Sequence, residues 1–234
     1  MIKLELAQGV RAVITTREGG CSLPPFASNN FGLHVGDNPS HVQANRAALL
    51  QGLQGARHIQ WLEQVHGDKV VAASCTNATP EADACYSTER GVACAVMTAD
   101  CLPVLFYALD GSQIAAAHAG WRGLASGILL QTLAAFPKNQ PVGAYLGPAI
   151  GPDAFEVGPE VQTAFPWASA ACFKAGQGDR LLANLYLLAR EQLSHAGVQV
   201  ITGGDYCTYQ DATRFYSYRR DGKTGRMASL IWRV

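Results

Sequence analysis

Short apolar runs separated by turn-forming residues fill the middle of the chain. They are IQWLEQV (59–65), KVVAA (69–73), DACYS (83–87), VACAVM (92–97) and LPVLFYA (102–108). Runs of this length, rich in β-branched and aromatic residues and bounded by Gly, Pro, Asn or Asp, are typical of strands. The sequence therefore predicts neighbouring strands here, and further strands at 11–16, 142–147, 198–202, 215–218 and 228–234.

Asp110-Gly111 lies between the run at 102–108 and a second apolar run, QIAAAHA, at 113–119. The dipeptide Asp-Gly suits the tight turns that join antiparallel strands. We therefore expect a hairpin at this point.

Helical patterns flank and follow these strands. Asn38-Pro39 has the form of a capping residue followed by proline in the first turn, which predicts a helix to about residue 53. A helical period also covers 121–136 and 179–196, the latter ending before a glycine. Residues 17–37 form a long polar loop, and loops of that length are usually functional.

Strands that follow one another with few intervening helices argue against a doubly wound parallel sheet. No repeat, low-complexity tract or linker interrupts the order of elements. We expect an α/β (α+β) fold, a layered arrangement of mixed sheets in a single domain over residues 1–234.

Charge limits the choice of partners. Lys and Arg number 18 and Asp and Glu also number 18, so the formal net charge is zero. Nucleic acids and anionic membranes are held by an excess of basic residues, and neither the total nor a local run supplies one. We therefore expect no nucleic-acid partner and no membrane partner. Separately, we expect either a monomer or a weak homodimer.

The chain has 7 cysteines, an odd number, and no C-x-x-C pair. The first twenty residues lack the apolar run of a signal peptide, and no stretch is long and apolar enough for a membrane helix. We therefore expect a cytoplasmic protein in which the thiols stay reduced and most are small core residues.

Candidate metal ligands or nucleophiles occur in three segments at the ends of predicted strands: QVHGD (64–68), TADCLP (98–103) and AAAHAGWRG (115–123). The segments carry His66, Cys101 and His118. Three protein ligands with a fourth position open are the pattern of a catalytic zinc site. Spacing alone is a weak signal, because histidines at strand ends are more often hydrogen-bonded structural residues and most cysteines lie in the core.

Several motifs, in order, resemble the YfiH-like laccase-domain family, also called multicopper polyphenol oxidoreductase laccases. They are TTREGGCS, NNFGLHVGDNPSHVQANR, QVHGDKVV, ADACYS, MTADCLPVLF, AAAHAGWRGLASGIL, LGPAIGP followed by FEVG, and CTYQDATRFYSYRRDGKTGRMASLI. They span almost the whole chain, and their number and order make the resemblance specific.

The resemblance implies a layered mixed-sheet fold and a zinc-dependent purine nucleoside enzyme. It implies phosphorolysis of adenosine, inosine, guanosine and methylthioadenosine, deamination of adenosine, and a link to the fidelity of peptidoglycan precursors. The partners are then a purine nucleoside and phosphate. The family's metal ligands fall on His66, Cys101 and His118.

The chain departs from the family pattern at two places. Asp153-Ala154 stands where many members carry a cysteine pair, so those thiols are not required. Asn184-Leu185 stands where members often have Asp-Leu, which argues against a required carboxylate at that position.

Further residues are candidates for catalysis and for binding substrate or phosphate. Phosphorolysis needs cationic or N–H donors for phosphate, which arginine provides in bidentate form. Arg122 is the first candidate and is grouped with the catalytic residues, and Arg46 and Arg17 follow as phosphate-binding candidates, although Arg46 also suits a solvated helix face. Asp100 is a candidate for orienting a ligand or binding substrate, and Glu156 for proton transfer or for binding substrate.

Two other functions remain open. A copper-dependent polyphenol oxidase is the first, because blue copper sites use the same His and Cys ligands and most such sites bind Cu²⁺ more tightly than Zn²⁺. A full four-copper laccase centre needs more histidines than the 6 in this chain. The second is a non-catalytic binding module in which the metal only joins strands.

Overall fold

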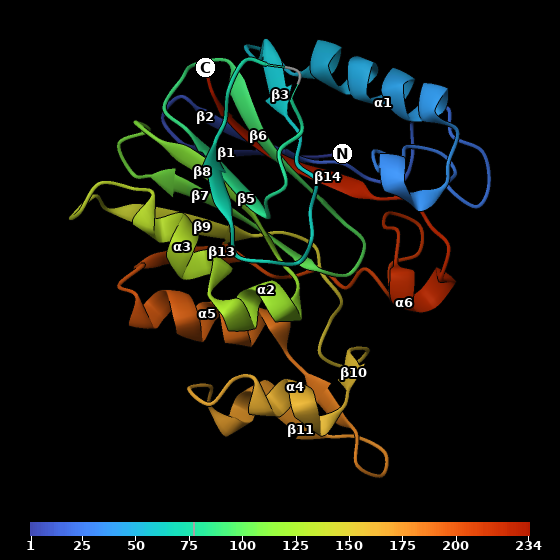
Figure 1. The fold of residues 1–234 in the computed structure, drawn as a ribbon, viewed down its shortest axis with the longest axis vertical. Helices are drawn as coiled ribbons and strands as arrows, with labels where there is room; N and C mark the ends of the chain where they lie inside the picture. The colour runs from blue at the N-terminus through green and yellow to red at the C-terminus, as the bar shows by residue number, and fades with distance from the viewer. Residues whose placement is uncertain (77) are drawn as a thin grey trace.

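Two large sheets lie face to face in the computed structural model, which describes residues 1–76 and 78–234 (Figure 1). The first has five strands in the order β1-β2-β14-β6-β3. Their bounds are Ile2–Ala7 (β1), Val10–Ile14 (β2), Met227–Arg233 (β14), Val92–Thr98 (β6) and His58–Gln60 (β3). Only β3, next to β6, is added in parallel, so the sheet is mixed.

The second sheet has six strands in the order β13-β9-β7-β8-β5-β4. Their bounds are Val200–Gly203 (β13), Val142–Leu146 (β9), Leu102–Ala108 (β7), Ile114–Ala119 (β8), Ala84–Ser87 (β5) and Val70–Ala72 (β4). The outermost pair at each edge is parallel and the central pairs are antiparallel. The hairpin between β7 and β8 turns at Asp110-Gly111, as predicted, with Gly111 at φ 73°.

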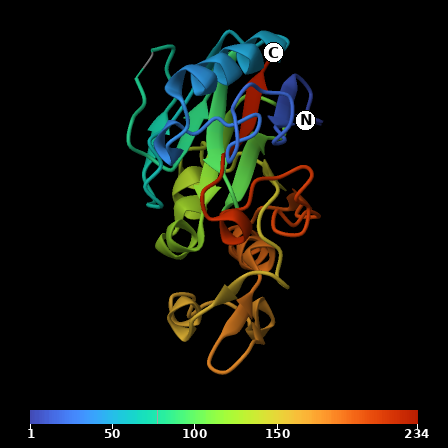
Figure 2. The same ribbon diagram turned by 90° about the vertical axis from the view of Figure 1, so that its right-hand side faces the viewer.

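A small third sheet, β10-β12-β11, lies at one end of the molecule beside α4 (Figures 1 and 2). Its strands are Glu156–Val157 (β10), Leu181–Ala183 (β12) and Phe173–Ala175 (β11). The helices among the described residues are Pro39–Gly52 (α1), Trp121–Ser126 (α2), Ile128–Ala134 (α3), Pro159–Thr163 (α4), Leu185–His195 (α5) and Tyr218–Asp221 (α6), with 3-10 turns at Leu33–Val35 (η1) and Ala170–Cys172 (η2).

Three layers of apolar contact explain why the central strands are apolar on both faces. Alternate residues of β6 point to opposite sides: Cys94 and Val96 pack between the two large sheets, whereas Ala95 packs under α1. Likewise Leu105 of β7 lies between the sheets, and Phe106 faces the layer of α2, α3 and α5. Both large sheets are therefore buried on their inner and outer faces, as near-continuous apolar runs require.

The expected α/β fold of layered mixed sheets is confirmed, and several predicted elements match. Helix α1 is capped as predicted, since the Asn38 side chain accepts a hydrogen bond from the Ser40 amide and Pro39 occupies the first turn. That residues 1–234 form one domain stays a prediction. No helix within the described residues is long and apolar enough to cross a membrane.

Other predicted elements were wrong in extent or type. The helix expected over 121–136 divides into α2 and α3 because Gly127 adopts a left-handed conformation, φ 94°. The helix expected from residue 179 begins at Leu185, since residues 181–183 pair as β12 instead.

The predicted strand at 215–218 is also wrong. Phe215 and Tyr216 are buried, but Ser217 caps α6 by accepting a hydrogen bond from the Arg220 amide. The pattern at 59–65 forms a strand only over 58–60, and β1 and the strands of the third sheet were not predicted. Short strands with two to six residues carry too little periodicity to be distinguished from loops.

Candidate metal centre

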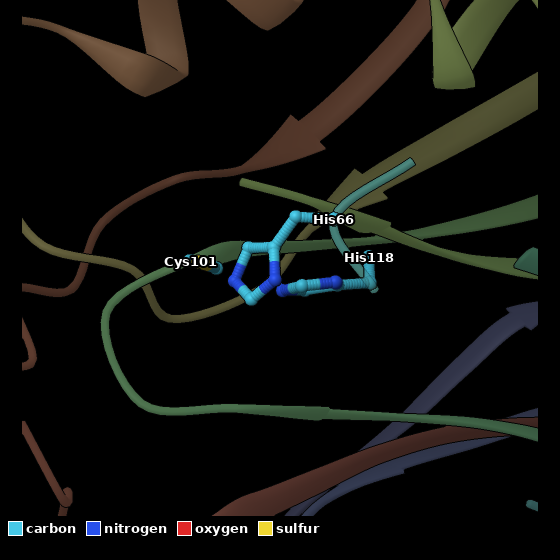
Figure 3. A group of neighbouring side chains, drawn as sticks. All are labelled: His66, Cys101 and His118. Atoms are coloured by element: carbon cyan, nitrogen blue, oxygen red, sulfur yellow. The ribbon is translucent and has the colours of Figure 1, made fainter. Parts of the chain in front are cut away.

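Three side chains from separate segments meet at one end of the two central strands of the six-stranded sheet, β7 and β8. Cys101 directly precedes β7, His118 lies within β8, and His66 lies in the connection between β3 and β4. Because β7 and β8 pair with Leu102 opposite Ala119, Cys101 and His118 are neighbours across the sheet. The possible ligand atoms of all three residues lie within 4.8 Å of one another, and the two imidazole rings are 4.7 Å apart (Figure 3).

Asp83, fully buried just before β5, holds this group in place. Its Oδ1 lies 2.8 Å from His118 Nδ1 and accepts the His66 amide at 2.9 Å, and its Oδ2 accepts the Gly67 amide at 2.7 Å. With Nδ1 of His118 committed to the carboxylate, Nε2 is the nitrogen left for a ligand. A carboxylate that orients a histidine in this way is the usual outer partner of a metal-bound imidazole.

Gln64 and Gly120 fix the remaining geometry. The Gln64 side chain donates to the Met97 carbonyl at 2.8 Å and accepts the Met97 amide at 2.7 Å, so it takes the place of a strand partner beside β6. It thereby anchors the turn at His66, which has φ 63°. A Cβ atom at Gly120 would lie 2.9 Å from Cys101 Sγ and 3.1 Å from His66 Cδ2, so glycine leaves the space that the group needs.

The electrostatics of the group favour a charged pair. Burial would raise the pKa of the Cys101 thiol, but His118 and His66 beside the sulfur outweigh it and bring the pKa to about 6. Burial would lower the pKa of His118, yet the Cys101 sulfur and the Asp83 carboxylate raise it to about 9. At neutral pH the metal-free pair is therefore a thiolate beside an imidazolium.

The donor set fits a metal ion. One thiolate and two imidazoles suit Zn²⁺ or copper better than Mg²⁺ or Ca²⁺, which take oxygen ligands. Within the described residues no fourth His, Cys, Asp or Glu joins the group. The side that lacks a protein ligand faces a cavity, so the arrangement has the form of an open site.

The cavity has a volume of about 430 Å³ and two walls of different origin. We call His66, Cys101 and His118 the ligand wall. Four residues from elsewhere in the chain form what we call the arginine wall: His34 from η1, Tyr218 and Arg219 from α6, and Arg226, which directly precedes β14. Met97, Ile150 and Phe155 add apolar surface between them.

Asp100 is the one further candidate residue that lines the cavity. Its carboxylate accepts hydrogen bonds from Thr208 Oγ1 at 2.6 Å and from the Arg219 amide at 2.7 Å. These contacts join the turn before Cys101 to α6, so Asp100 links the two walls.

The other candidates lie outside the described lining of the cavity. Arg46 donates to the Phe31 carbonyl at 2.7 and 3.0 Å and stacks on Trp61, and burial lowers its pKa to about 10. Arg17 donates to the carbonyls of Ala27 and Ala212.

Arg122 is exposed and lies 4.4 Å over the Trp121 ring. Glu156 is exposed in β10, and its backbone carbonyl accepts a hydrogen bond from Arg219 at 2.9 Å. Roles for Arg17, Arg46, Arg122 and Glu156 in binding or catalysis stay predictions.

The sequence pattern did not single out Asp83, Arg219, Arg226 or His34 as site residues, although His34 lies in the long polar loop over residues 17–37 that was expected to be functional. A signal for Asp83 was its place before an apolar strand, in ADACYS. For the two arginines it was the density of basic residues in YRRDGKTGR. Neither signal indicates which side chains turn toward the ligands.

The chain is similar over nearly its whole length to a protein family, to named relatives and to solved structures. The sequence model of the family described as multi-copper polyphenol oxidoreductase laccase matches residues 11–234. A protein of Escherichia coli (strain K12) named purine nucleoside phosphorylase YfiH is 52% identical over 231 residues, covering 97% of this chain and 95% of its own. A Pseudomonas aeruginosa protein named purine nucleoside phosphorylase is 49% identical, covering 95% and 93%. A crystal structure of a Neisseria meningitidis protein superposes with a TM-score of 0.93 at 48% identity, covering 99% and 98% of the two chains.

Proposed function

The chain belongs to the multi-copper polyphenol oxidoreductase laccase family, and from that premise we propose that it is a zinc-dependent purine nucleoside phosphorylase. Its substrates are adenosine, inosine, guanosine and methylthioadenosine, and deamination of adenosine is a second activity of the same site. It works in the cytoplasm as a monomer or weak homodimer. The printed names of the Escherichia coli and Pseudomonas aeruginosa relatives support the reaction class.

One observation carries the proposal: the His66, Cys101 and His118 group opens onto a cavity of substrate size. A volume of about 430 Å³ lies in the range of small-molecule sites. A structural metal site would usually be closed by a fourth protein ligand. The open side therefore supports a metal that acts on a bound molecule.

The residues around the cavity have different roles in this proposal. Met97, Ile150 and Phe155 offer the apolar surface that a purine ring needs, and their burial excludes water from one side of it. Asp83 holds His118 by Nδ1 and so keeps the ligand nitrogen aimed at the cavity. A zinc ion, when bound, supplies Lewis acidity to this site.

The direct test is to incubate metal-replete protein with adenosine, with and without inorganic phosphate, and to identify the products. Adenine and ribose 1-phosphate that form only with phosphate support phosphorolysis, and inosine supports the second activity. If metal-replete protein yields neither product, the proposal is wrong.

Cys101→Ser separates a catalytic metal from a structural one. The variant is expected to stay folded, lose zinc and lose nucleoside cleavage. Cys75→Ser, at an exposed cysteine, is the matched control and is expected to keep both. Loss of the fold together with the metal would instead favour a non-catalytic binding module in which the metal only joins strands. An intense visible thiolate band with stoichiometric copper would favour the copper-dependent oxidase.

A further inference from the structure

The arginine wall contributes two arginines, Arg219 and Arg226, to the lining of the same cavity as Cys101 and His118. Arg226 is the better fixed of the two. Its backbone amide donates to Asn30 Oδ1 at 2.9 Å, and its Nη1 donates to the Thr224 and Gly225 carbonyls, each at 3.0 Å. Its stem packs on Gly32, where a Cβ atom would come within 2.9 Å of Arg226 Cγ. The guanidinium is therefore held in one orientation before any ligand arrives.

Arg226 also has no protein counter-ion. Within residues 1–76 and 78–234 its guanidinium makes no ion pair, and Nε and Nη2 make no hydrogen bond. Its burial lowers its pKa, although the negative charges of Cys101 and Asp100 partly offset this. A half-buried cation with free donors needs an anion, and an anionic ligand in the cavity would supply one.

Arg219 adds a second cation at the mouth of the cavity. Its Nη1 is anchored to the Glu156 carbonyl at 2.9 Å, and the guanidinium lies 5.6 Å from the Phe155 ring centre. Its backbone amide binds the Asp100 carboxylate. Asp100 is the nearby acid, and both of its oxygens are already engaged by Thr208 and Arg219, so it does not neutralise either guanidinium by a direct ion pair.

The pKa of His34 reflects the positive charges that surround it at the arginine wall. This pKa is lowered first by burial and then by the charges of Arg226 and Arg46. Three cationic or potentially cationic groups thus line the same cavity as the thiolate and the imidazoles. Such a site favours an oxyanion over a neutral ligand.

We propose that Arg226 and Arg219, with His34 beside them, bind inorganic phosphate as the nucleophile of the reaction. The inference rests on the proposed phosphorolysis. In that step a phosphate oxygen forms a bond to C1′ of the ribose while the bond from C1′ to N9 breaks. The electron pair of the broken bond stays with the purine, which takes up the proton of HPO₄²⁻, and ribose 1-phosphate is the second product. Arginine forks hold the remaining phosphate oxygens in the orientation for attack.

The test compares Arg226→Gln, Arg226→Lys and Arg219→Gln with the wild type. We expect the KM for phosphate to rise about 10- to 100-fold in Arg226→Gln, as for loss of a charged hydrogen-bond donor. The KM for adenosine should change by less than about twofold, and Arg219→Gln should show a smaller rise because that side chain is more exposed. Arg226→Lys should recover only part of the loss, because lysine lacks the planar fork. Arg180→Gln, at an exposed arginine that directly precedes β12, is the matched control.

Two binding measurements keep the subsite testable without turnover. Inorganic phosphate should bind the metal-loaded wild type in a calorimetric titration and should bind Arg226→Gln at least about tenfold more weakly. Phosphate should also protect Arg226, and not Arg180, from phenylglyoxal, as read by peptide mass spectrometry. The second measurement uses the wild type and so does not depend on the folding of a variant.

Each outcome separates the subsite from the proposed function. Phosphorolysis with an unchanged KM for phosphate in Arg226→Gln, and no protection of Arg226, would overturn the subsite and leave the function. Phosphate binding that depends on Arg226 without phosphorolysis would keep the subsite and overturn the function. Binding of a nucleoside 5′-monophosphate that depends on Arg226, with no binding of inorganic phosphate, would assign the wall to a substrate phosphate and overturn the nucleophile proposal.

Discussion

On the ligand wall, Cys101 directly precedes β7 and His118 lies within β8, the strand paired with β7, whereas the arginine wall is built from η1, α6 and the segment before β14. On the ligand wall, one buried carboxylate, Asp83, joins His66 and His118. The arginine wall is held by backbone carbonyls and by Asp100.

The two constructions suit different tasks. A metal ion tolerates little variation in ligand position, and paired strands supply that precision. A substrate must enter and leave, and loops positioned by a rigid scaffold are the usual elements for binding it. The contrast predicts that changes at the ligand wall act on metal affinity, and changes at the arginine wall act on the binding of the anionic ligand.

The largest effect on this contrast is expected from Asp83→Asn. The amide has one oxygen in place of two, so it cannot accept from His66, Gly67 and His118 together. Zinc affinity should fall about 10- to 100-fold, as for loss of other carboxylates that orient a metal-bound histidine. Competition with a chromophoric chelator measures the change, and Asp153→Asn, at an exposed carboxylate, is the control. Phosphate affinity that fell as far as zinc affinity would contradict the separation of the walls.

The contrast also explains what the sequence could predict. The residues of the ligand wall were found because each lies at the end of a predicted strand beside glycine or proline, where the type of residue and its position both indicate chemistry. Asp83 was missed because a single carboxylate before an apolar strand is indistinguishable from an ordinary turn residue. Its burial arises only when the loop at Gln64 and strand β8 close over it.

Arg219 and Arg226 were missed for a different reason. More than one hundred residues separate each of them from Cys101 and His118, and a basic run usually marks a solvated surface. Arg122 was preferred instead because it is near His118 in sequence, but in the structure its side chain is exposed and lies over Trp121. A role for Arg122 stays a prediction.

A pH series sharpens the contrast from the ligand side. The pKa of Cys101 is about 6, so its thiol is already ionised above that pH in the metal-free protein. The pKa of His118 is about 9, so its imidazole keeps its proton up to that pH. Zinc binding must therefore release one proton between these values, and zinc affinity should rise about tenfold per pH unit there. Below about pH 6 a second proton, from Cys101, must also leave, so the slope steepens. Chelator competition at pH 7 and pH 8 measures the slope.

Sulfate serves as the comparison for the arginine wall, because its charge is constant over this range. Arginine also keeps its charge, so sulfate affinity should change by less than about twofold from pH 7 to pH 8.

For the ligand wall, a zinc affinity independent of pH would show that Cys101 and His118 are not a thiolate and an imidazolium in the metal-free protein.

A smaller effect is expected from Gly120→Ala. The added methyl group would lie 2.9 Å from Cys101 Sγ, so the ligands must shift by a few tenths of an ångström. We expect zinc affinity to fall about three- to tenfold, less than for Asp83→Asn. Gly52→Ala is the control, since nothing lies within 4 Å of its Cβ position at the end of α1. Equal zinc affinity in both variants would mean that the ligand wall is less rigid than its strands suggest.

The smallest effect is expected at Asn184, which belongs to neither wall. Its Oδ1 accepts the Leu187 amide at 3.0 Å and so caps α5. Aspartate caps a helix equally well, so the Asp-Leu that the family resemblance implies at this position needs no catalytic carboxylate. Asn184→Asp should therefore change the free energy of unfolding by less than about 0.5 kcal/mol, whereas Asn184→Ala should cost about 1 kcal/mol. Denaturant unfolding measures both, with zinc and phosphate affinities followed in parallel. A change in either affinity with Asn184→Asp would connect the cap to the cavity and break the division into two independent walls.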